Sequence, residues 1–427
     1  MIKIIDCKGI KSFSKVSKLL AKRKLSSTAN KNLVDKILKD IKRNGDKGLI
    51  KYEKKYSKNR EIIVNNKKIS KAIKLLDPKV KRAIDFSLRR IFNFHSRQKV
   101  QNIFYKDKLN NKLYYKYKPI DSVAIYVPGG NASFPSTVLM NAIPAKIAGV
   151  KRIVMINPKL NGKQSPAVLY AAKKLGIKEI YSIGGAQAIA ALTYGTKKIK
   201  KVDKIVGPGN IFVSNAKKSV FGDVGIDMVA GPSEITVVAD KFSKANWVAA
   251  DLLAQAEHDS NSQCILISMD KNFIIKVKNS IIDQLKDLPR KMIAKKSLQL
   301  NGILIKAYSN KQIADIVNLI APEHLELSLK NYNSILNRVN NAGSICLGNY
   351  SAMAVTDYNA GTNHILPTNS SSKFSSGLSV YDFYKRISYI NLSKKGIETL
   401  GPSVITLAKF EGLEGHAKSI KIRLGRN

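Results

Sequence analysis

Histidine is scarce in this 427-residue sequence, and most of its five copies stand beside acids or amides. Gln255 precedes His258 by three positions, and Glu323 directly precedes His324. Imidazole, carboxylate and amide groups of this kind bind zinc and transfer protons. Because the chain has so few histidines and most of them stand beside acids or amides, we expect the segments that carry them to converge on one site.

Each of these pairs also has an ordinary interpretation. Gln255 and His258 stand near the end of a predicted helix (KANWVAADLLAQAEH), where their spacing places both side chains on one face. One metal ion could bind both, or His258 could simply satisfy the last carbonyl groups of the helix. Glu323 and His324 follow Pro322 near the end of the predicted helix KQIADIVNLIAPEHLEL. These two residues could act together in acid–base catalysis, or they could form an ordinary pair on the surface.

Two further histidines lie closer to the C-terminus, each after an acid. Asp357 precedes His364 in TDYNAGTNH, a predicted loop, where a carboxylate is more often solvated than ligating. Asp357 therefore matters only if folding brings it to His258, and we interpret His364 as a structural imidazole bonded to backbone. Glu411 precedes His416 in a C-terminal tail, which normally lies on the surface. A functional role for these two residues requires the tail to reach a cleft, for example in another subunit.

Glycine-rich loops follow three predicted strands, at residues 127–130 (VPGG), 184–187 (GGAQ) and 207–210 (GPGN). Glycine lets a ligand approach the backbone closely, and the start of a following helix offers unpaired N–H groups that suit a phosphate or nucleotide. The alternative is an ordinary turn with Asn210 as helix cap. The full dinucleotide-binding pattern G-x-G-x-x-G is absent. Three such loops at successive strand ends nevertheless favour one shared ligand crevice.

Short apolar strands alternate with helices from about residue 120 onward, for example SVAIYVPGG followed by STVLMNAIPAKIAGV. This alternation is typical of βαβ units, so we predict an α/β fold with two incomplete Rossmann-like parallel-sheet domains. Residues 31–105 are mostly amphipathic helix. We expect the following division of the chain: an N-terminal arm at 1–24, a discontinuous α/β domain at 25–117 with 236–380, a continuous one at 118–235, and a C-terminal helical tail at 381–427.

The composition excludes several classes of protein. No run of eighteen apolar residues and no signal-peptide core is present, so we expect a cytoplasmic protein without a membrane span. The cysteines are three, far apart and without a C-x-x-C pair, which argues against a disulfide framework. The net charge of +44 invites a nucleic-acid-binding interpretation. Because lysine is spread over the whole chain and no nucleic-acid-binding motif occurs, we expect no specific nucleic-acid partner.

Ordered segments over essentially the whole length resemble the histidinol dehydrogenase family. The matching stretches are YVPGG, GGAQAIAALTYGT, VDKIVGPGN, AGPSE, AQAEH, APEHLEL, GNYSAMAVTDYNAGTNHILPT and EGLEGHAKSIKIR. The resemblance implies an enzyme of histidine biosynthesis that depends on zinc and NAD. Such an enzyme oxidises L-histidinol to L-histidine in two NAD-linked steps, through an aldehyde that stays bound. The resemblance also implies a homodimer of intertwined chains, in which the C-terminal tail completes the neighbouring subunit's site.

The same resemblance implies roles for single residues. One zinc ion per subunit would be bound by Gln255, His258 and Asp357 of one chain and by His416 of the other, with 25–117 and 236–380 carrying the zinc and catalytic residues. His324 resembles the general base of the family, and Glu323 the group that activates water for the aldehyde stage. The residues implied to contact substrate are Ser233, Gln255, His258, His324, Asp357, Glu411 and His416.

Residues 118–235 would bind NAD, with Tyr126, Gln187 and Asn210 at the contacting positions, one at or beside each glycine-rich loop. The chain departs from the family pattern at Thr356, where glycine is common, and at Ala352 and Gly415. Because glycine tolerates a positive φ and threonine does not, Thr356 could displace the Asp357 loop. Two other hypotheses remain open: a related dehydrogenase for another amino alcohol or a sulfonated diol, and a nucleic-acid binder motivated by charge alone.

Overall fold

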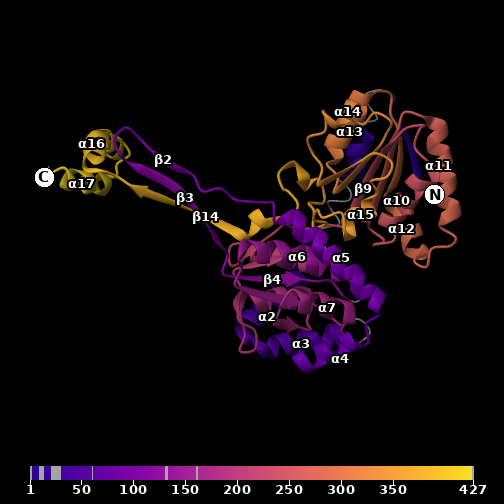
Figure 1. Cartoon of the computed structure of the whole chain (residues 1–427), viewed down its shortest axis with the longest axis horizontal. Coiled ribbons are helices and arrows are strands. Elements are labelled where there is room, and N and C mark those ends of the chain that lie inside the picture. Colours follow the sequence, from indigo (N-terminus) through magenta and orange to yellow (C-terminus); the bar gives the residue numbers. More distant parts are fainter. Residues whose placement is uncertain are drawn as a thin grey trace. The chain divides into compact units, whose positions relative to one another are not determined.

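The computed structural model describes residues 2–8, 14–20, 30–59, 61–129, 133–159 and 162–425. The chain forms two compact units. The first comprises Met1–Arg97 and Asp121–Asp382, and the second comprises Gln98–Ile120 and Phe383–Asn427. The first unit contains two parallel sheets flanked by helices, which confirms the predicted α/β class (Figure 1).

The five-stranded sheet of the first unit has the order β6-β5-β4-β7-β8, and all neighbouring strands are parallel. Its strands are short apolar segments that helices cover on both faces, as parallel sheets require. The strands are β4 (Ser122–Tyr126), β5 (Arg152–Ile156), β6 (Glu179–Tyr181), β7 (Lys204–Val206) and β8 (Gly225–Ile226). The helices between them are α6 (Pro135–Ala148), α7 (Pro166–Lys174), α8 (Gly185–Tyr194) and α9 (Ile211–Val220).

Four helices from the N-terminal part of the chain complete the layers around this sheet: α2 (Lys31–Asn44), α3 (Asp46–Ser57), α4 (Asn66–Lys74) and α5 (Pro78–His95). The apolar faces of α2 and α3 share a core with α8 and α9, and α5 packs on α6 and α7 (Figure 1). The prediction that residues 31–105 are mainly helical is thus confirmed for α2 to α5. These helices pack around the five-stranded sheet, whereas we expected residues 25–117 to join the other sheet. The hydrophobic periodicity of a helix shows which face is buried but not which sheet buries it.

The six-stranded sheet has the order β1-β11-β10-β9-β12-β13, again with parallel neighbours only. Its strands are β1 (Lys3–Asp6), β9 (Glu234–Ala239), β10 (Gln263–Ser268), β11 (Gly302–Lys306), β12 (His324–Ser328) and β13 (Ser344–Leu347). One face packs on α10 (Ala245–Ala256), α11 (Lys271–Gln284) and α12 (Lys291–Asn301). The other packs on α13 (Asn310–Ile320) and α14 (Asn333–Leu336). The short helix α15 (Met353–Tyr358) and the 3-10 helices η1 (Ser371–Lys373) and η2 (Val380–Phe383) follow.

Two local predictions are wrong in this region. The predicted helix that included Glu323 and His324 ends at Ile320, and His324 instead begins strand β12. Ala321 takes a left-handed conformation with φ of 49°, and the following Pro322 has no N–H with which to continue the helix. The predicted loop around Asp357 is the helix α15.

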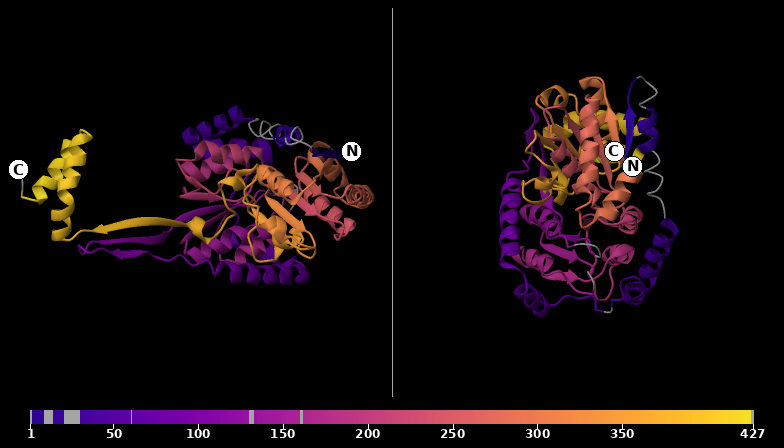
Figure 2. Two further views of the ribbon diagram at one scale, coloured as in Figure 1. Left: turned by 90° about the horizontal axis from the view of Figure 1, so that it is seen from above. Right: turned by 90° about the vertical axis from the view of Figure 1, so that its right-hand side faces the viewer.

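The second unit contains a three-stranded antiparallel sheet of β2 (Phe104–Lys106), β3 (Lys112–Pro119) and β14 (Tyr384–Asn391). Helices α16 (Lys394–Phe410) and α17 (Glu414–Arg423) follow β14 and pack on each other. The left view of Figure 2 shows these strands as a narrow ribbon that leads to the two helices. The predicted helical tail is therefore confirmed for α16 and α17, but its first part is a strand. No helix among the described residues has the length and apolar character needed to cross a membrane.

Candidate active site

His324 lies at the centre of a buried polar cluster in the first unit. Its Nε2 is 3.8 Å from Oδ1 of Asp357 and 3.9 Å from Oε1 of Glu323. The other carboxylate oxygen of Glu323 accepts a hydrogen bond from the backbone N–H of Glu234 at 2.8 Å. Both Glu323 and His324 are buried. The folded chain thus brings Asp357 to the predicted catalytic pair.

These residues meet at the amino-terminal edge of the six-stranded sheet. Glu234 begins β9, His324 begins the neighbouring β12, and helix α10 ends at Ala256, just before His258. The C-terminal end of a helix carries partial negative charge, so the end of α10 favours a cation beside Gln255 and His258. The ligand crevice expected from the glycine-rich loops concerns the carboxyl ends of strands in the five-stranded sheet. The cluster around His324 lies at the amino-terminal edge of the six-stranded sheet.

The side chain of Gln255 provides a test of whether these residues fit a metal ion. Gln255 is completely buried, and neither Oε1 nor Nε2 has a hydrogen-bond partner among the described residues. A buried amide without partners is costly, so it is expected where a ligand completes its bonding. Oxygen and imidazole nitrogen donors from Gln255, Asp357 and His258 fit zinc. Among the described residues no three His, Cys, Asp or Glu side chains form a metal-binding group by themselves, so a site here needs the amide and a further donor.

Burial controls the charges of this cluster. Loss of solvent, reinforced by His364 and His258, lowers the pKa of His324 to about 3. Burial raises the pKa of Asp357 to about 7. Loss of solvent around the imidazole and the positive charge of Arg290 also lower the pKa of His258, although part of that side chain reaches solvent. His324 is consequently a neutral imidazole near neutral pH, the form that can accept a proton.

The helix that carries Asp357 is held on both sides. His364 places its Nδ1 2.8 Å from the carbonyl oxygen of Asp357, which confirms the interpretation of His364 as an imidazole bonded to backbone. Arg90 of α5 donates to the carbonyl oxygens of Asn359 and Ala360 at 3.1 and 3.0 Å. Thr356 is not among the residues with positive φ, and its hydroxyl donates to Met353 O at 2.7 Å. Threonine therefore introduces no backbone strain beside Asp357.

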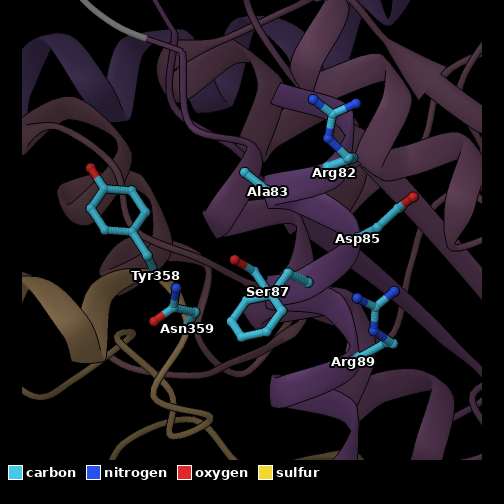
Figure 3. Close-up of a pocket in the computed structure, with 8 residues that line it drawn as sticks. Arg82, Ala83, Asp85, Ser87, Arg89, Tyr358 and Asn359 are labelled. Atoms are coloured by element: carbon cyan, nitrogen blue, oxygen red, sulfur yellow. The ribbon is translucent and has the colours of Figure 1, made fainter. Parts of the chain in front are cut away.

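A surface hollow adjoins this helix. Figure 3 shows Arg82, Asp85 and Arg89 along α5 on one wall, with Tyr358 and Asn359 opposite them. Asp85 is already engaged, because it pairs with Lys174 at 3.1 Å and accepts from the hydroxyl of Tyr170 at 2.9 Å. The hollow thus gives the residues after Asp357 access to solvent without adding a free carboxylate.

The residues predicted to contact NAD lie at the carboxyl edge of the five-stranded sheet. Tyr126 ends β4, and its hydroxyl oxygen accepts from Gly185 N at 3.0 Å. Gln187, in the first turn of α8, donates through Nε2 to Oε1 of Glu53 at 2.9 Å. Both side chains are buried and bonded to protein groups. Among the described residues, the hydroxyl of Tyr126 donates no hydrogen bond.

Asn210 takes the capping role that is its ordinary interpretation. Its Oδ1 accepts from the backbone N–H groups of Phe212 and Val213 at the start of α9. In the same loop Gly207 has φ of 110°, and a Cβ there would lie 2.3 Å from Tyr126 O. Glycine is thus required for strands β4 and β7 to pass this closely.

The remaining predicted residues fall into two places. Ser233 directly precedes Glu234, so it lies beside the backbone group that binds Glu323. Glu411 and His416 belong to the second unit, at the end of α16 and in the first turn of α17, where both are exposed. A Cβ at Gly415 would meet nothing within 4 Å, so glycine is not required before His416. The contribution of Glu411 and His416 to the site stays a prediction.

Sequence reasoning missed Glu53. This glutamate is completely buried on α3, and its Oε1 also accepts from Gly184 N at 3.1 Å, in the loop that starts α8. Desolvation raises its pKa despite the hydrogen bonds from Gln187 and Gly184. The only sequence signal was an acid on the apolar side of an amphipathic helix.

Comparison with known proteins shows the family to which the chain belongs. Residues 20–424 match the profile of the family described as histidinol dehydrogenase. Histidinol dehydrogenase of Pelagibacter ubique is 64% identical over 428 residues, which cover 100% of both chains. That of Rhizobium meliloti is 45% identical over 95% of this chain and 94% of its own. The crystal structure of histidinol dehydrogenase from Elizabethkingia anophelis matches with a TM-score of 0.91 at 37% identity, over 99% of this chain and 98% of that one. The chain therefore belongs to the histidinol dehydrogenase family of NAD-linked oxidoreductases.

Proposed function

We propose that this protein oxidises L-histidinol to L-histidine with two NAD per turnover and one zinc ion per subunit. The observation that carries the proposal is the buried cluster in which His324 lies within 4 Å of Glu323 and Asp357, together with the buried amide of Gln255, which has no partner among the described residues. A polar cluster of this kind, left incomplete by protein groups alone, is expected at a ligand site.

Gln255, His258 and Asp357 would hold zinc together with His416 of the partner subunit. The metal ion would orient the substrate through its imidazole and amino nitrogens. A fourth donor from the partner would link zinc affinity to formation of the homodimer. Ser233 and Glu411 would contribute further substrate contacts.

His324 is suited to the first oxidation. Its neutral imidazole would accept the hydroxyl proton of the alcohol while hydride leaves the adjacent carbon for NAD. The product of this step is the aldehyde, one NADH and the proton on His324. The charge on the imidazolium would then be stabilised by Asp357 and Glu323, whose carboxylates lie near Nε2.

Glu323 is suited to the second oxidation. Its carboxylate would take a proton from the water that attacks the aldehyde carbon, and the hydrate would then give hydride to a second NAD. The hydrogen bond from Glu234 N fixes one carboxylate oxygen and leaves Oε1 directed toward His324. Retaining the aldehyde between the steps avoids release of a reactive intermediate.

Tyr126, Gln187 and Asn210 would position NAD at the carboxyl edge of the five-stranded sheet, where nucleotides bind in such folds. The substrates are small polar molecules, and we expect the enzyme to act in the cytoplasm without specific nucleic-acid or membrane partners.

The test is a comparison of candidate alcohols with the zinc-loaded protein and NAD. We expect histidinol to be oxidised to histidine, detected by mass spectrometry, and amino alcohols or sulfonated diols without an imidazole to react far more slowly. Preference for one of these other alcohols would refute histidinol as the substrate and leave the family assignment intact.

A further inference from the structure

A second pair of acids lies beneath the cluster. Glu326 stands two residues after His324 on β12, so both side chains point to the same face of the sheet. Asp251 stands one helical turn before Gln255 on α10, which packs on that face. Glu326 is only 3% exposed, and neither acid belongs to the groups that would touch substrate. Placing a partly buried carboxyl beside a buried one costs free energy, so the pair needs a structural explanation.

Glu326 caps a helix that carries a site residue. Its Oε1 accepts a hydrogen bond of 2.5 Å from the backbone N–H of Met353, the first residue of α15. Ala352, which precedes this helix, offers no side-chain cap. A carboxyl oxygen at a helix start satisfies one of its unpaired N–H groups. Glu326 thus fixes the start of the helix whose next turn holds Asp357.

Glu326 also bonds to the helix that carries Gln255. The side chains of Asp251 and Glu326 form a hydrogen bond, which requires one shared proton. Burial and the neighbouring Asp251 raise the pKa of Glu326 well above its usual value, whereas that of Asp251 rises to about 6. The proton between the two carboxyls thus holds β12 to α10. Cys346 on the neighbouring strand β13 faces Glu326. Burial raises the pKa of the Cys346 thiol to about 12, so the thiol stays neutral.

We propose that Glu326 and Asp251 are positioning residues for the zinc site, because their hydrogen bonds join β12, α10 and α15 and thereby set the spacing of His324, Gln255 and Asp357. This inference rests on the proposed zinc-dependent function. Groups that orient metal ligands from behind typically change metal affinity by ~10–100-fold when they are removed.

Three variants separate positioning from general stability. Glu326→Gln keeps both bonds, since its amide oxygen can accept from Met353 N and its NH₂ can donate to Asp251. Glu326→Leu removes both bonds at similar volume. Leu327→Ala is the matched control, because Leu327 is equally buried on the same strand but faces the opposite core with α13 and α14. It creates a cavity without touching the pair.

The measurement is zinc affinity of the metal-free full-length proteins, read from a competition titration with a zinc-binding dye and from the zinc-induced rise in Tm. We expect Glu326→Gln to bind zinc within about threefold of wild type and Glu326→Leu to bind ~10–100-fold more weakly. Leu327→Ala should lower the Tm of the metal-free protein while zinc affinity stays near wild type. If Glu326→Leu does not fold, Asp251→Ala, which leaves the cap on α15 in place, should show the loss and Asp251→Asn should restore binding.

Several results would overturn the inference. Wild-type affinity in Glu326→Leu or Asp251→Ala would show that the pair does not position the ligands. Equal losses in Glu326→Gln and Glu326→Leu, or in Leu327→Ala and Glu326→Leu, would show that the hydrogen bonds are not the cause. Failure of the wild-type protein itself to bind zinc would instead refute the proposed zinc-dependent function. The variants would then not be needed to tell this failure from a failure of the positioning inference.

Discussion

The imidazole Nε2 of His324 lies 3.8 Å from Oδ1 of Asp357, although the two residues belong to different elements, β12 and α15. The contact joins the proposed base to a proposed zinc ligand. Proton transfer by His324 and zinc binding by Asp357 can be tested separately by mutation, because only Nε2 of His324 faces the cluster. The buried Nδ1 of His324 has no hydrogen-bond partner among the described residues.

His324→Ala should lower kcat by ~10²–10⁴-fold, the usual contribution of a general base, while zinc content stays near that of wild type. The reason is that His324 is placed to move a proton, whereas Gln255, His258 and Asp357 supply the donors. Steady-state kinetics and metal analysis of the same preparation check both parts. Loss of zinc together with activity would show that His324 acts as a ligand instead.

Asp357→Ala and His416→Ala should each lose zinc and activity, but co-expressed together they should recover activity. If each site takes Asp357 from one chain and His416 from the other, random pairing gives half heterodimers with one intact site each, or about a quarter of wild-type activity. The matched control is Asp357→Ala with His324→Ala. Both residues lie in the first unit of one chain, so this mixture should stay inactive. Recovery in the control, or none in the test mixture, would contradict a site shared between subunits.

Glu53→Ala should raise KM for NAD by about five- to tenfold, the effect of losing a hydrogen bond worth ~1–1.4 kcal/mol, with little change in KM for histidinol. Without Glu53 the amide of Gln187 and the N–H of Gly184 lose their acceptor. Glu53→Gln keeps that acceptor and should restore KM. Equal changes in both Michaelis constants would point to a general loosening of the fold.

The same glutamate predicts a pH dependence of stability. Burial raises the pKa of Glu53 in the folded protein, so folding favours its protonated form. The stability that this provides is complete below the unfolded pKa of about 4.3 and is lost as pH rises through the folded pKa, at ~1.4 kcal/mol per pH unit between the two pKa values. The Tm of wild type minus that of Glu53→Gln should therefore fall between pH 5 and pH 8. A constant difference, or one that grows with pH, would contradict a raised pKa.

The sequence predicted the helix end at Gln255 and His258 correctly, but it did not predict the strand that begins at His324. Spacing placed Gln255 and His258 at a helix end, and α10 confirms this because a helix end depends on local signals. Glu323 and His324 were predicted to lie near a helix end, yet His324 begins strand β12 and Glu323 directly precedes it. The apolar spacing of APEHLEL fits both structures, and only pairing with β9 and β13 decides between them.

The supporting acids could not be found from the sequence. Glu53 reaches Gln187 across more than a hundred residues, and Glu326 meets Asp251 and Met353 only after β12, α10 and α15 have packed. Each of these acids occupies an apolar face, where local patterns predict either a surface charge or an interruption of the core. Their partners are set by tertiary structure alone.

The most direct test of the central claim is the number of NADH formed per molecule of limiting histidinol by the zinc-loaded wild-type enzyme. The proposed two-step oxidation at one site predicts about two NADH per histidinol, with histidine as the product and no free aldehyde trapped by a carbonyl reagent. One NADH with accumulation of trapped aldehyde would contradict it, as would no NADH in the presence of zinc.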